Sequence, residues 1–448
     1  MTPFDVAASG ETTLDLIRVF VLLLGAASLV TLLARRIRLP YTVALVAFGL
    51  AAGTFQSSVR FEITPQLVLV VLLPALIFEA SYRIDFGHLR PILPEVALLA
   101  GPGVLITAGV IAVALHLGAG LDLGPAFAVG AMLAATDPAA VIATFRQFDS
   151  PRRLATLVEA ESVFNDGTGI VLFALAVDFV SHPVGPGQMV VTFVWVAVAS
   201  ASIGAIAGLV VSRLMPSVGD HVIEISLSVV LAYGTYLLAD SFHLSGVIAT
   251  AVAGIMLGSH ARGRRLSDRT EDALDTVWEF VAFLATAFVF LVVGFAIPLR
   301  SLEDVAPAIA WAFVAALVSR ALIVYGLVGG WRLVRRRMAP GPRPGSAKGA
   351  LDAGPIPVSG WLHVIFWAGL RGAVSTALAL SLPLDFPNRG ALQGITFGVV
   401  LVTLLLQATT AEVVVARWGR ERGSHGSGPA VPASELEAGG PLDPEQAS

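Results

Sequence analysis

The chain has 448 residues, of which 56% are hydrophobic and only 13% are charged. Soluble domains carry about 25% charged residues, so this composition excludes an ordinary soluble domain and indicates a polytopic membrane protein. The chain has no cysteine, which excludes disulfides and thiolate metal sites, and its net charge of −4 is less informative than the positions of its basic residues.

Apolar segments of about 20 residues, the length of a membrane-spanning helix, recur along the chain. We expect an all-α fold with about thirteen of them. They lie near 14–34, 40–57, 66–82, 94–117, 124–145, 154–181, 188–212, 221–240, 243–260, 276–298, 305–331, 358–383 and 390–416. The first ends in Arg35, Arg36 and Arg38, which is typical of a retained helix and not of a cleaved signal peptide.

The basic residues predict the orientation of these helices. Most of the 28 Lys and Arg residues fall in alternate loops, whereas the opposite loops hold only Arg60, Arg300 and Arg389. An excess of Lys and Arg marks the cytoplasmic loops of a membrane protein. We therefore expect a multi-pass protein of the cell membrane, with its N-terminus outside and its C-terminus in the cytoplasm.

This orientation also predicts an inverted repeat. The first helix then runs inward and the eighth, near 221–240, runs outward. The six helices before 188–212 and the six after it can form two halves of opposite topology, with the seventh helix as a connector. Inverted repeats of this kind are typical of secondary transporters.

The fifth and twelfth helices hold matching positions in the two halves, and both contain residues that interrupt helices. The fifth contains Pro138, and the twelfth contains Gly369, Gly372 and Pro383. We expect both helices to be discontinuous and to cross, because broken helices expose backbone ends that can bind ions at the midplane. The alternative is that Gly and Pro are simply common in membrane helices.

The sixth helix carries the polar residues Glu161, Ser162, Asn165 and Asp166 inside a long apolar run. A charged side chain at this depth costs about 2.5–3.5 kcal/mol or more, so it is usually functional. At a rise of 1.5 Å per residue, Glu161 lies about 12 Å and Asp166 about 20 Å from the cytoplasmic start of the helix. Ser162 and Asp166 are four residues apart and share one face.

Thr136 and Asp137 lie at similar depth in the fifth helix, directly before Pro138. The proline frees upstream carbonyl groups. These carbonyls, the Thr136 and Ser162 hydroxyls and the Asp166 carboxylate are hard oxygen ligands that suit a small cation such as Na⁺. If a proton and a cation compete for Asp166, alternating access is sufficient for antiport.

Three arginines, Arg18, Arg320 and Arg371, are also expected within helices. Arg320 lies near the middle of the eleventh helix and needs a carboxylate partner there. Glu161 and Asp137 are the available candidates, and we favour a structural pair with Glu161 because this leaves Asp166 free to titrate. Arg371 lies within the glycine-flanked break, where its charge could oppose backbone dipoles or repel cations.

Three motifs carry a resemblance to a known family: ATDPAAV, ESVFNDGTGIV and GLRGAVSTALAL. Together with LLPALIFEASY and LSGVIATAVAGIMLG, they resemble the sodium/proton exchanger family, in its electroneutral NhaP/NHE-like branch. The likeness runs over nearly all of residues 14–416.

The resemblance implies a thirteen-helix fold that works as a homodimer by an elevator-like movement. It implies an antiporter domain over 1–416, with core helices near 66–181 and 243–416 and the remaining helices as scaffold and dimerisation unit. Residues 417–448 are Gly-, Ser- and Pro-rich, and we expect them to form a disordered cytoplasmic tail.

The resemblance also assigns roles to residues. It implies that Asp166 carries the ion with Asn165 beside it, and that this Asn-Asp pair goes with one-for-one electroneutral exchange. Thr136, Asp137, Ser162 and Glu161 match family site positions, and Arg320 matches the arginine that pairs with the glutamate. We expect Na⁺ to bind at Asp166, Ser162 and Thr136.

The leading hypothesis is therefore a secondary Na⁺(Li⁺)/H⁺ antiporter that is not an enzyme and has no cofactor or nucleic-acid partner. A K⁺/H⁺ antiporter is the alternative, since the sequence does not fix the size of the site. A cation channel would favour a filter on an oligomer axis, and an intramembrane aspartyl protease would need two acids, such as Asp137 and Asp166, around a scissile bond. The broken helix and the expected Glu161–Arg320 pair favour transport over both.

Overall fold

The computed structural model describes residues 21–34, 36, 40–55, 67–148, 150–182, 184–261, 266–296, 302–338 and 359–419. Every regular element within these ranges is a helix, which confirms the all-α fold. The first two residues of the expected tail, Arg417 and Trp418, belong to the last helix, and the tail beyond residue 419 lies outside the described residues.

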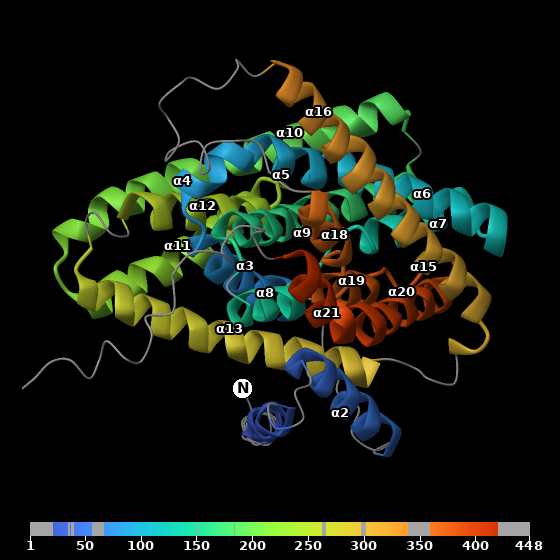
Figure 1. The fold of residues 1–448 in the computed structure, drawn as a ribbon, viewed down its shortest axis with the longest axis horizontal. Helices are drawn as coiled ribbons and strands as arrows, with labels where there is room; N and C mark the ends of the chain where they lie inside the picture. Colours follow the sequence, from blue (N-terminus) through green and yellow to red (C-terminus); the bar gives the residue numbers. More distant parts are fainter. Residues whose placement is uncertain are drawn as a thin grey trace, which may run out of the picture.

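Figure 1 shows the helices with their labels. The first half contains α2 (Tyr41–Phe55), α3 (Leu73–Tyr82), α4 (Phe86–Leu89), α5 (Leu93–Ala100), α6 (Pro102–Ala119), α7 (Leu123–Met132), α8 (Ala139–Gln147) and α9 (Arg152–Ser181). The remainder contains α10 (Pro186–Leu214), α11 (His221–Ser241), α12 (Gly246–Ala261), α13 (Asp268–Ala296), α15 (Ala306–Ala321), α16 (Gly329–Met338), α18 (Ser359–Trp367), α19 (Ala373–Leu380), α20 (Arg389–Thr403) and α21 (Thr409–Trp418).

Seven continuous helical segments of the described residues are long and apolar enough to cross a membrane. They are Phe86–Ala119, Arg152–Ser181, Pro186–Ser217, His221–Ser241, Asp268–Phe295, Ala306–Arg335 and Arg389–Trp418. Shorter apolar helices precede the first segment and also lie between some of the segments. The protein is thus a multi-pass membrane protein, while the count of thirteen crossings and the inverted repeat stay predictions.

Helix α9 lies inside the bundle (Figure 1). It contacts α3, α5, α6, α7, α8, α10, α12 and α19. Buried side chains occur on every face of α9, from Leu154 to Ala176, as expected for a helix enclosed by others. Polar groups on α9 therefore face protein and not lipid.

Helix α10 shows the opposite pattern. Its buried residues include Ser200, Gly204, Gly208 and Ser212, which repeat every four residues and form one narrow stripe. Small residues at this spacing let two helix backbones approach closely in a membrane, and α10 packs along α12. The remaining faces of α10 carry exposed apolar side chains such as Val191 and Trp195.

The helices pack in two sets. In one set α6, α7, α9, α15 and α20 contact one another, and in the other α2 packs on α13 while α3, α10 and α11 pack on α12. A separate small hydrophobic cluster, with Phe78 and Trp278 among its members, joins α3, α11, α12 and α13. The division into a moving core and a dimerisation unit stays a prediction.

Both helices expected to be broken are discontinuous. The chain leaves the helical conformation between α7 and α8 and again between α18 and α19. Pro138 directly precedes the first turn of α8, where a proline is tolerated. Of the three residues expected to interrupt the second helix, Gly369 and Gly372 lie in its break, whereas Pro383 lies beyond the end of α19 at Leu380 and takes no part in the break.

The two breaks touch each other. The backbone N–H of Asp137 in the first break donates to the carbonyl oxygen of Leu370 in the second at 2.9 Å. A Cβ atom added at Gly369 would lie 2.8 Å from Nε of Arg320, and one added at Gly372 would overlap the Asp137 side chain. Both glycines are therefore required by close approach.

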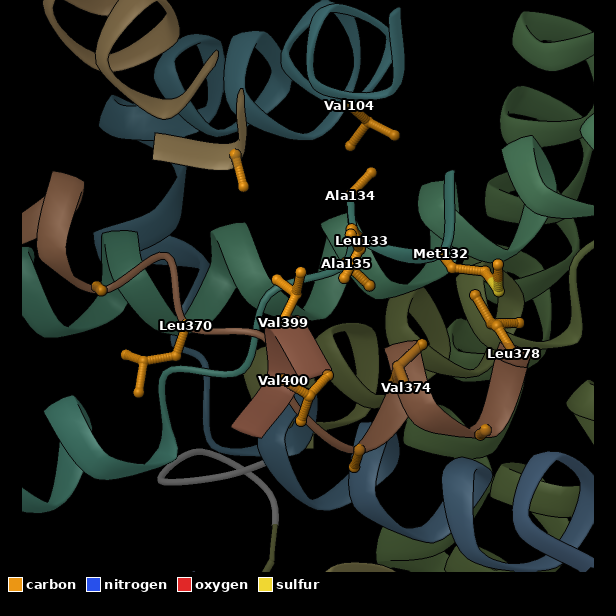
Figure 2. Close-up of a cluster of buried hydrophobic side chains, with 14 of the residues drawn as sticks. Val104, Met132, Leu133, Ala134, Ala135, Leu370, Val374, Leu378, Val399 and Val400 are labelled. Carbon is orange, nitrogen blue, oxygen red and sulfur yellow. The ribbon is translucent and has the colours of Figure 1, made fainter. Parts of the chain in front are cut away.

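Buried apolar side chains surround this crossing, as Figure 2 shows. They come from α6, the end of α7, the two breaks, α19 and α20, and include Val104, Met132, Leu133, Ala134, Ala135, Leu370, Val374, Leu378, Val399 and Val400. Because no water is available among such side chains, the backbone groups freed by the breaks need partners within the protein.

Candidate ion-binding site at the helix crossing

Asp137 meets the N-terminal ends of two half-helices. Its Oδ1 accepts a hydrogen bond from the backbone N–H of Ala139 at 3.1 Å, in the first turn of α8. The same carboxylate accepts one from the backbone N–H of Ala373, the first residue of α19. Helix N-termini carry partial positive charge, so one carboxylate stabilises both.

Two arginines meet the C-terminal ends of the partner half-helices. Nη1 of Arg371 donates to the carbonyl oxygens of Ala134 at 3.1 Å and Ala135 at 3.2 Å, just after α7. Nη2 of Arg320 donates to the carbonyl oxygen of Ile365 in α18 at 2.7 Å. These contacts agree with the interpretation that Arg371 opposes backbone dipoles, because helix C-termini carry partial negative charge.

Arg320 also binds Glu161 with both ends of its guanidinium group. Nη1 lies 2.6 Å from Oε1 and Nη2 lies 2.8 Å from Oε2. The two residues are 5% and 1% exposed. The structure thus brings Arg320 to Glu161 and not to Asp137, in the bidentate geometry that is strongest for this pair of groups.

A hydrogen-bond network joins α9 to the first break. The Ser162 hydroxyl donates to the carbonyl oxygen of Thr136 at 2.8 Å. Nδ2 of Asn165 donates to the Thr136 hydroxyl at 3.2 Å and to Oε1 of Glu161 at 3.4 Å. Because Ser162 uses its proton on a carbonyl, the lone pairs of its oxygen stay available to a cation.

A cavity of about 630 Å³ opens beside this network. Thr136, Asp137, Ser162 and Asp166 all line it, whereas Asn165 and Glu161 are not on its wall. Within the described part of the chain, no residue forms a hydrogen bond or ion pair with the Asp166 carboxylate. Asp166 is therefore the acid at the crossing that is free to bind what enters the cavity.

When its three acids are ionised, the crossing carries one negative charge that its two arginines do not compensate. The carboxylates of Asp137 and Glu161 both act electrostatically on Asp166, and the guanidinium groups of Arg320 and Arg371 are buried beside them. Three ionised acids against two arginines leave a net charge that one proton or one monovalent cation would neutralise. A buried charge without such a partner is costly.

The cavity extends away from the crossing to a charged cluster on α3 and α13. Nε of Arg83 lies 2.7 Å from Glu79, and its Nη2 lies 3.5 Å from Glu279, and all three residues line the cavity. The sequence alone indicates that both glutamates lie near helix ends, where capping or an interfacial position is the simplest reading. For Glu279 this expectation was wrong, because it lies well inside α13. Both glutamates line the cavity that reaches Asp166.

Sequence reasoning missed two further residues on the cavity wall, Glu159 and Ser375. Ser375 follows directly on the second break, within GLRGAVSTALAL, and its position after a glycine break was the available signal. No cluster of three or more His, Asp or Glu side chains that could hold a metal ion occurs in the described ranges. A cation here would rely on hydroxyl and carbonyl oxygens besides the Asp166 carboxylate.

The sequence of the chain is similar to those of known transport proteins. A family model described as the transmembrane sodium/hydrogen exchanger matches residues 22–417. The Na⁺/H⁺ antiporter ApNhaP of Aphanothece halophytica is 36% identical over 403 residues, covering 88% of this chain and 73% of that protein. The Na⁺/H⁺ antiporter NhaP of Pseudomonas aeruginosa is 31% identical over 427 residues, covering 90% of this chain and 96% of that protein.

The fold is similar to that of a solved structure, the sodium proton antiporter MjNhaP1 from Methanocaldococcus jannaschii at pH 8. The TM-score is 0.72 at 21% sequence identity, over 91% of this chain and 100% of the other. At this identity the likeness shows the fold, and the function has to be argued from the site.

Proposed function

The chain belongs to the sodium/hydrogen exchanger family, a family of transporters, and from this premise we propose that it is a secondary active Na⁺(Li⁺)/H⁺ antiporter. The relatives that it matches over most of their length carry the name Na⁺/H⁺ antiporter. The helix crossing, with its free carboxylate beside a cavity, supports the same activity.

Asp166 is the proposed carrier of both ions. The observation that carries this proposal is that Asp166 lines the cavity without a protein partner among the described residues, whereas Glu161 is bound to Arg320 and Asp137 to two helix ends. A carboxylate can hold either a proton or a cation, so the two compete for one place. Thr136 and Ser162 supply further oxygens for the cation.

The proposed exchange is electroneutral, one cation for one proton. The crossing leaves a single uncompensated negative charge when its acids are ionised, and either ion neutralises it. The binding site therefore has the same net charge in its two loaded states. Asn165, the neighbour of Asp166, adds no charge.

Alternating access requires that the site opens to one side of the membrane at a time. The cavity joins Asp166 to Arg83, directly after α3, and to Glu279 on α13, and the positive-inside rule places Arg83 in the cytoplasm. We infer that this conformation is open to the cytoplasm, in a cell-membrane protein with an outside N-terminus. Exposed apolar side chains on α10 and α11, such as Trp195 and Val230, face lipid or the second subunit of the proposed homodimer.

The direct test uses purified protein in liposomes with an internal acid load and a pH-sensitive dye. Na⁺, Li⁺ and K⁺ are added outside in turn, and the rate of proton efflux is measured for each cation. Efflux with Na⁺ and Li⁺ but not with K⁺ is the expected result. Efflux with K⁺ alone would establish the K⁺/H⁺ alternative, and cation flux without proton flux would indicate a channel.

A further inference from the structure

Ser375 is a buried hydroxyl group on the cavity wall that has no hydrogen-bond partner within the described residues. It lies in the first turn of α19, is 1% exposed, and its Oγ is unpaired. It lines the same cavity as Ser162 and Asp166. Buried polar groups in proteins are nearly always paired, so this exception requires an explanation.

The surrounding chain explains why Ser375 stays unpaired. A serine in a membrane helix usually donates to a backbone carbonyl three or four residues earlier, which here means Gly372 or Arg371. The Gly372 carbonyl accepts twice from Thr376, through its backbone N–H at 3.3 Å and its hydroxyl at 3.2 Å. The Ser375 hydroxyl lies on the cavity wall without a partner among the described residues.

We propose that the Ser375 hydroxyl is a ligand of the transported cation. The cation would then be held between α9, which supplies Asp166 and Ser162, and the second broken helix, which supplies Ser375. This inference rests on the proposed function and extends its ion site to the second half of the chain. A hydroxyl is a hard oxygen ligand of the kind that binds hard cations.

A cation bound at Ser375 would also affect how the site moves. The first residue of α19 also donates to Asp137, so a cation bound at Ser375 contacts an element that the first break already binds. Cation binding would tie α9, the first break and α19 together at one point. The occupied site would therefore move as a unit with the two crossing breaks.

The test compares Ser375→Ala with the neighbouring Thr376→Val in liposomes. Thr376 is equally buried but does not line the cavity. Thr376→Val removes a hydroxyl from the same helix turn, while the backbone N–H of residue 376 still donates to the Gly372 carbonyl. Loss of one ligand to a charged group should raise the KM for Na⁺ and Li⁺ about tenfold or more. The maximal rate at saturating cation should stay within about twofold, because a loss of ground-state binding alone leaves it unchanged.

A binding measurement without transport separates a ligand from a structural residue. Na⁺ should raise the melting temperature of the detergent-solubilised protein, and Ser375→Ala should need about tenfold more Na⁺ for the same rise. If Ser375→Ala does not fold, Ser375→Cys keeps the shape but replaces the hard oxygen by a softer sulfur, and the same shift in KM is expected.

Either of two results would overturn the inference that Ser375 binds the cation. An unchanged Na⁺ dependence in a folded Ser375→Ala or Ser375→Cys protein rules it out, and so does an equal shift in Thr376→Val. Absence of any cation-dependent proton efflux in the unmodified protein would overturn the proposed function as well. Normal exchange with an unaffected Ser375 variant would overturn this inference alone.

Discussion

At the scale of single residues, the three acids of the crossing differ in what surrounds them. Glu161 is held by Arg320 in two short contacts, and Asp137 accepts backbone N–H groups from two helices. Asp166 faces the cavity. Protein groups therefore bind the carboxylates of Glu161 and Asp137, whereas the Asp166 carboxylate has no such partner among the described residues.

This difference predicts the result of replacing Asp166. Asp166→Asn keeps the size of the side chain but removes its charge, so neither a proton nor a cation can be carried. We expect exchange to fall to the rate of empty liposomes while the melting temperature of the protein stays within a few degrees of the unmodified value. Proton efflux driven by Na⁺ in purified Asp166→Asn protein would contradict the assignment.

The buried pair of Glu161 and Arg320 predicts a loss of stability. Removing one partner of a buried pair strands the other charge, which typically costs about 3–5 kcal/mol. Glu161→Gln and Arg320→Ala should each lower the melting temperature sharply in detergent, and the double substitution should recover part of the loss.

A matched control for this pair is Glu79→Gln, because the contact of Glu79 with Arg83 is partly exposed. Exposed pairs contribute about 0–1 kcal/mol, so its effect on melting should be much smaller. Strictly additive losses for Glu161→Gln and Arg320→Ala would show that the bidentate contact does not stabilise the fold.

The sequence was sufficient to name Glu161 and Arg320 as partners, because very few charged residues lie deep in the apolar segments and each needs a partner. It was insufficient for Ser375. That hydroxyl is isolated because Thr376 occupies the Gly372 carbonyl. It matters because Ser162 and Asp166, which are distant in the chain, line the same cavity. A cavity shared by distant residues has no signature in a local motif.

At the scale of elements, the two breaks arise from different chemistry. The first contains Thr136 and Asp137 before Pro138, and the residue before a proline avoids the helical conformation, so this break was predictable to within a few residues. The second contains no proline, and its glycines matter because Arg320 and Asp137 approach them closely. Glycines that accommodate another helix cannot be told from ordinary membrane-helix glycines by sequence alone.

The close approach at Gly372 predicts a large effect of one methyl group. Gly372→Ala places a Cβ atom against the Asp137 side chain, and overpacking of this kind costs about 1–3 kcal/mol. The displaced Asp137 would also lose its contacts with α8 and α19, so we expect impaired transport together with a lower melting temperature.

The matched control is Gly109→Ala in α6, where an added Cβ meets no atom within 4 Å. Alanine is the better helix former, so this variant should be at least as stable as the unmodified protein and should transport normally. Equal behaviour of the two variants in melting and transport assays would show that the crossing is not closely packed around Gly372.

At the scale of the whole molecule, the arrangement of charge is one-sided. The cavity runs from Asp166 towards Glu79, Arg83 and Glu279, while buried apolar side chains close the other parts of the crossing (Figure 2). The sequence predicted the depth of the acids from helix length. It could not predict which side is open, since that depends on how α3 and α13 pack against the crossing.

The net charge of the crossing predicts the response of the intact transporter to voltage. A site that moves with one proton or with one Na⁺ has the same charge in both directions, so no net charge crosses the membrane in a full cycle. We expect the exchange rate in liposomes to change by less than about twofold when valinomycin and K⁺ gradients set the membrane potential to about 100 mV of either sign. That potential corresponds to about 2.3 kcal/mol for each elementary charge moved, so even one uncompensated charge per cycle would change the driving force strongly. A steep dependence of the rate on voltage would therefore exclude one-for-one exchange and would require a second site for a proton besides Asp166.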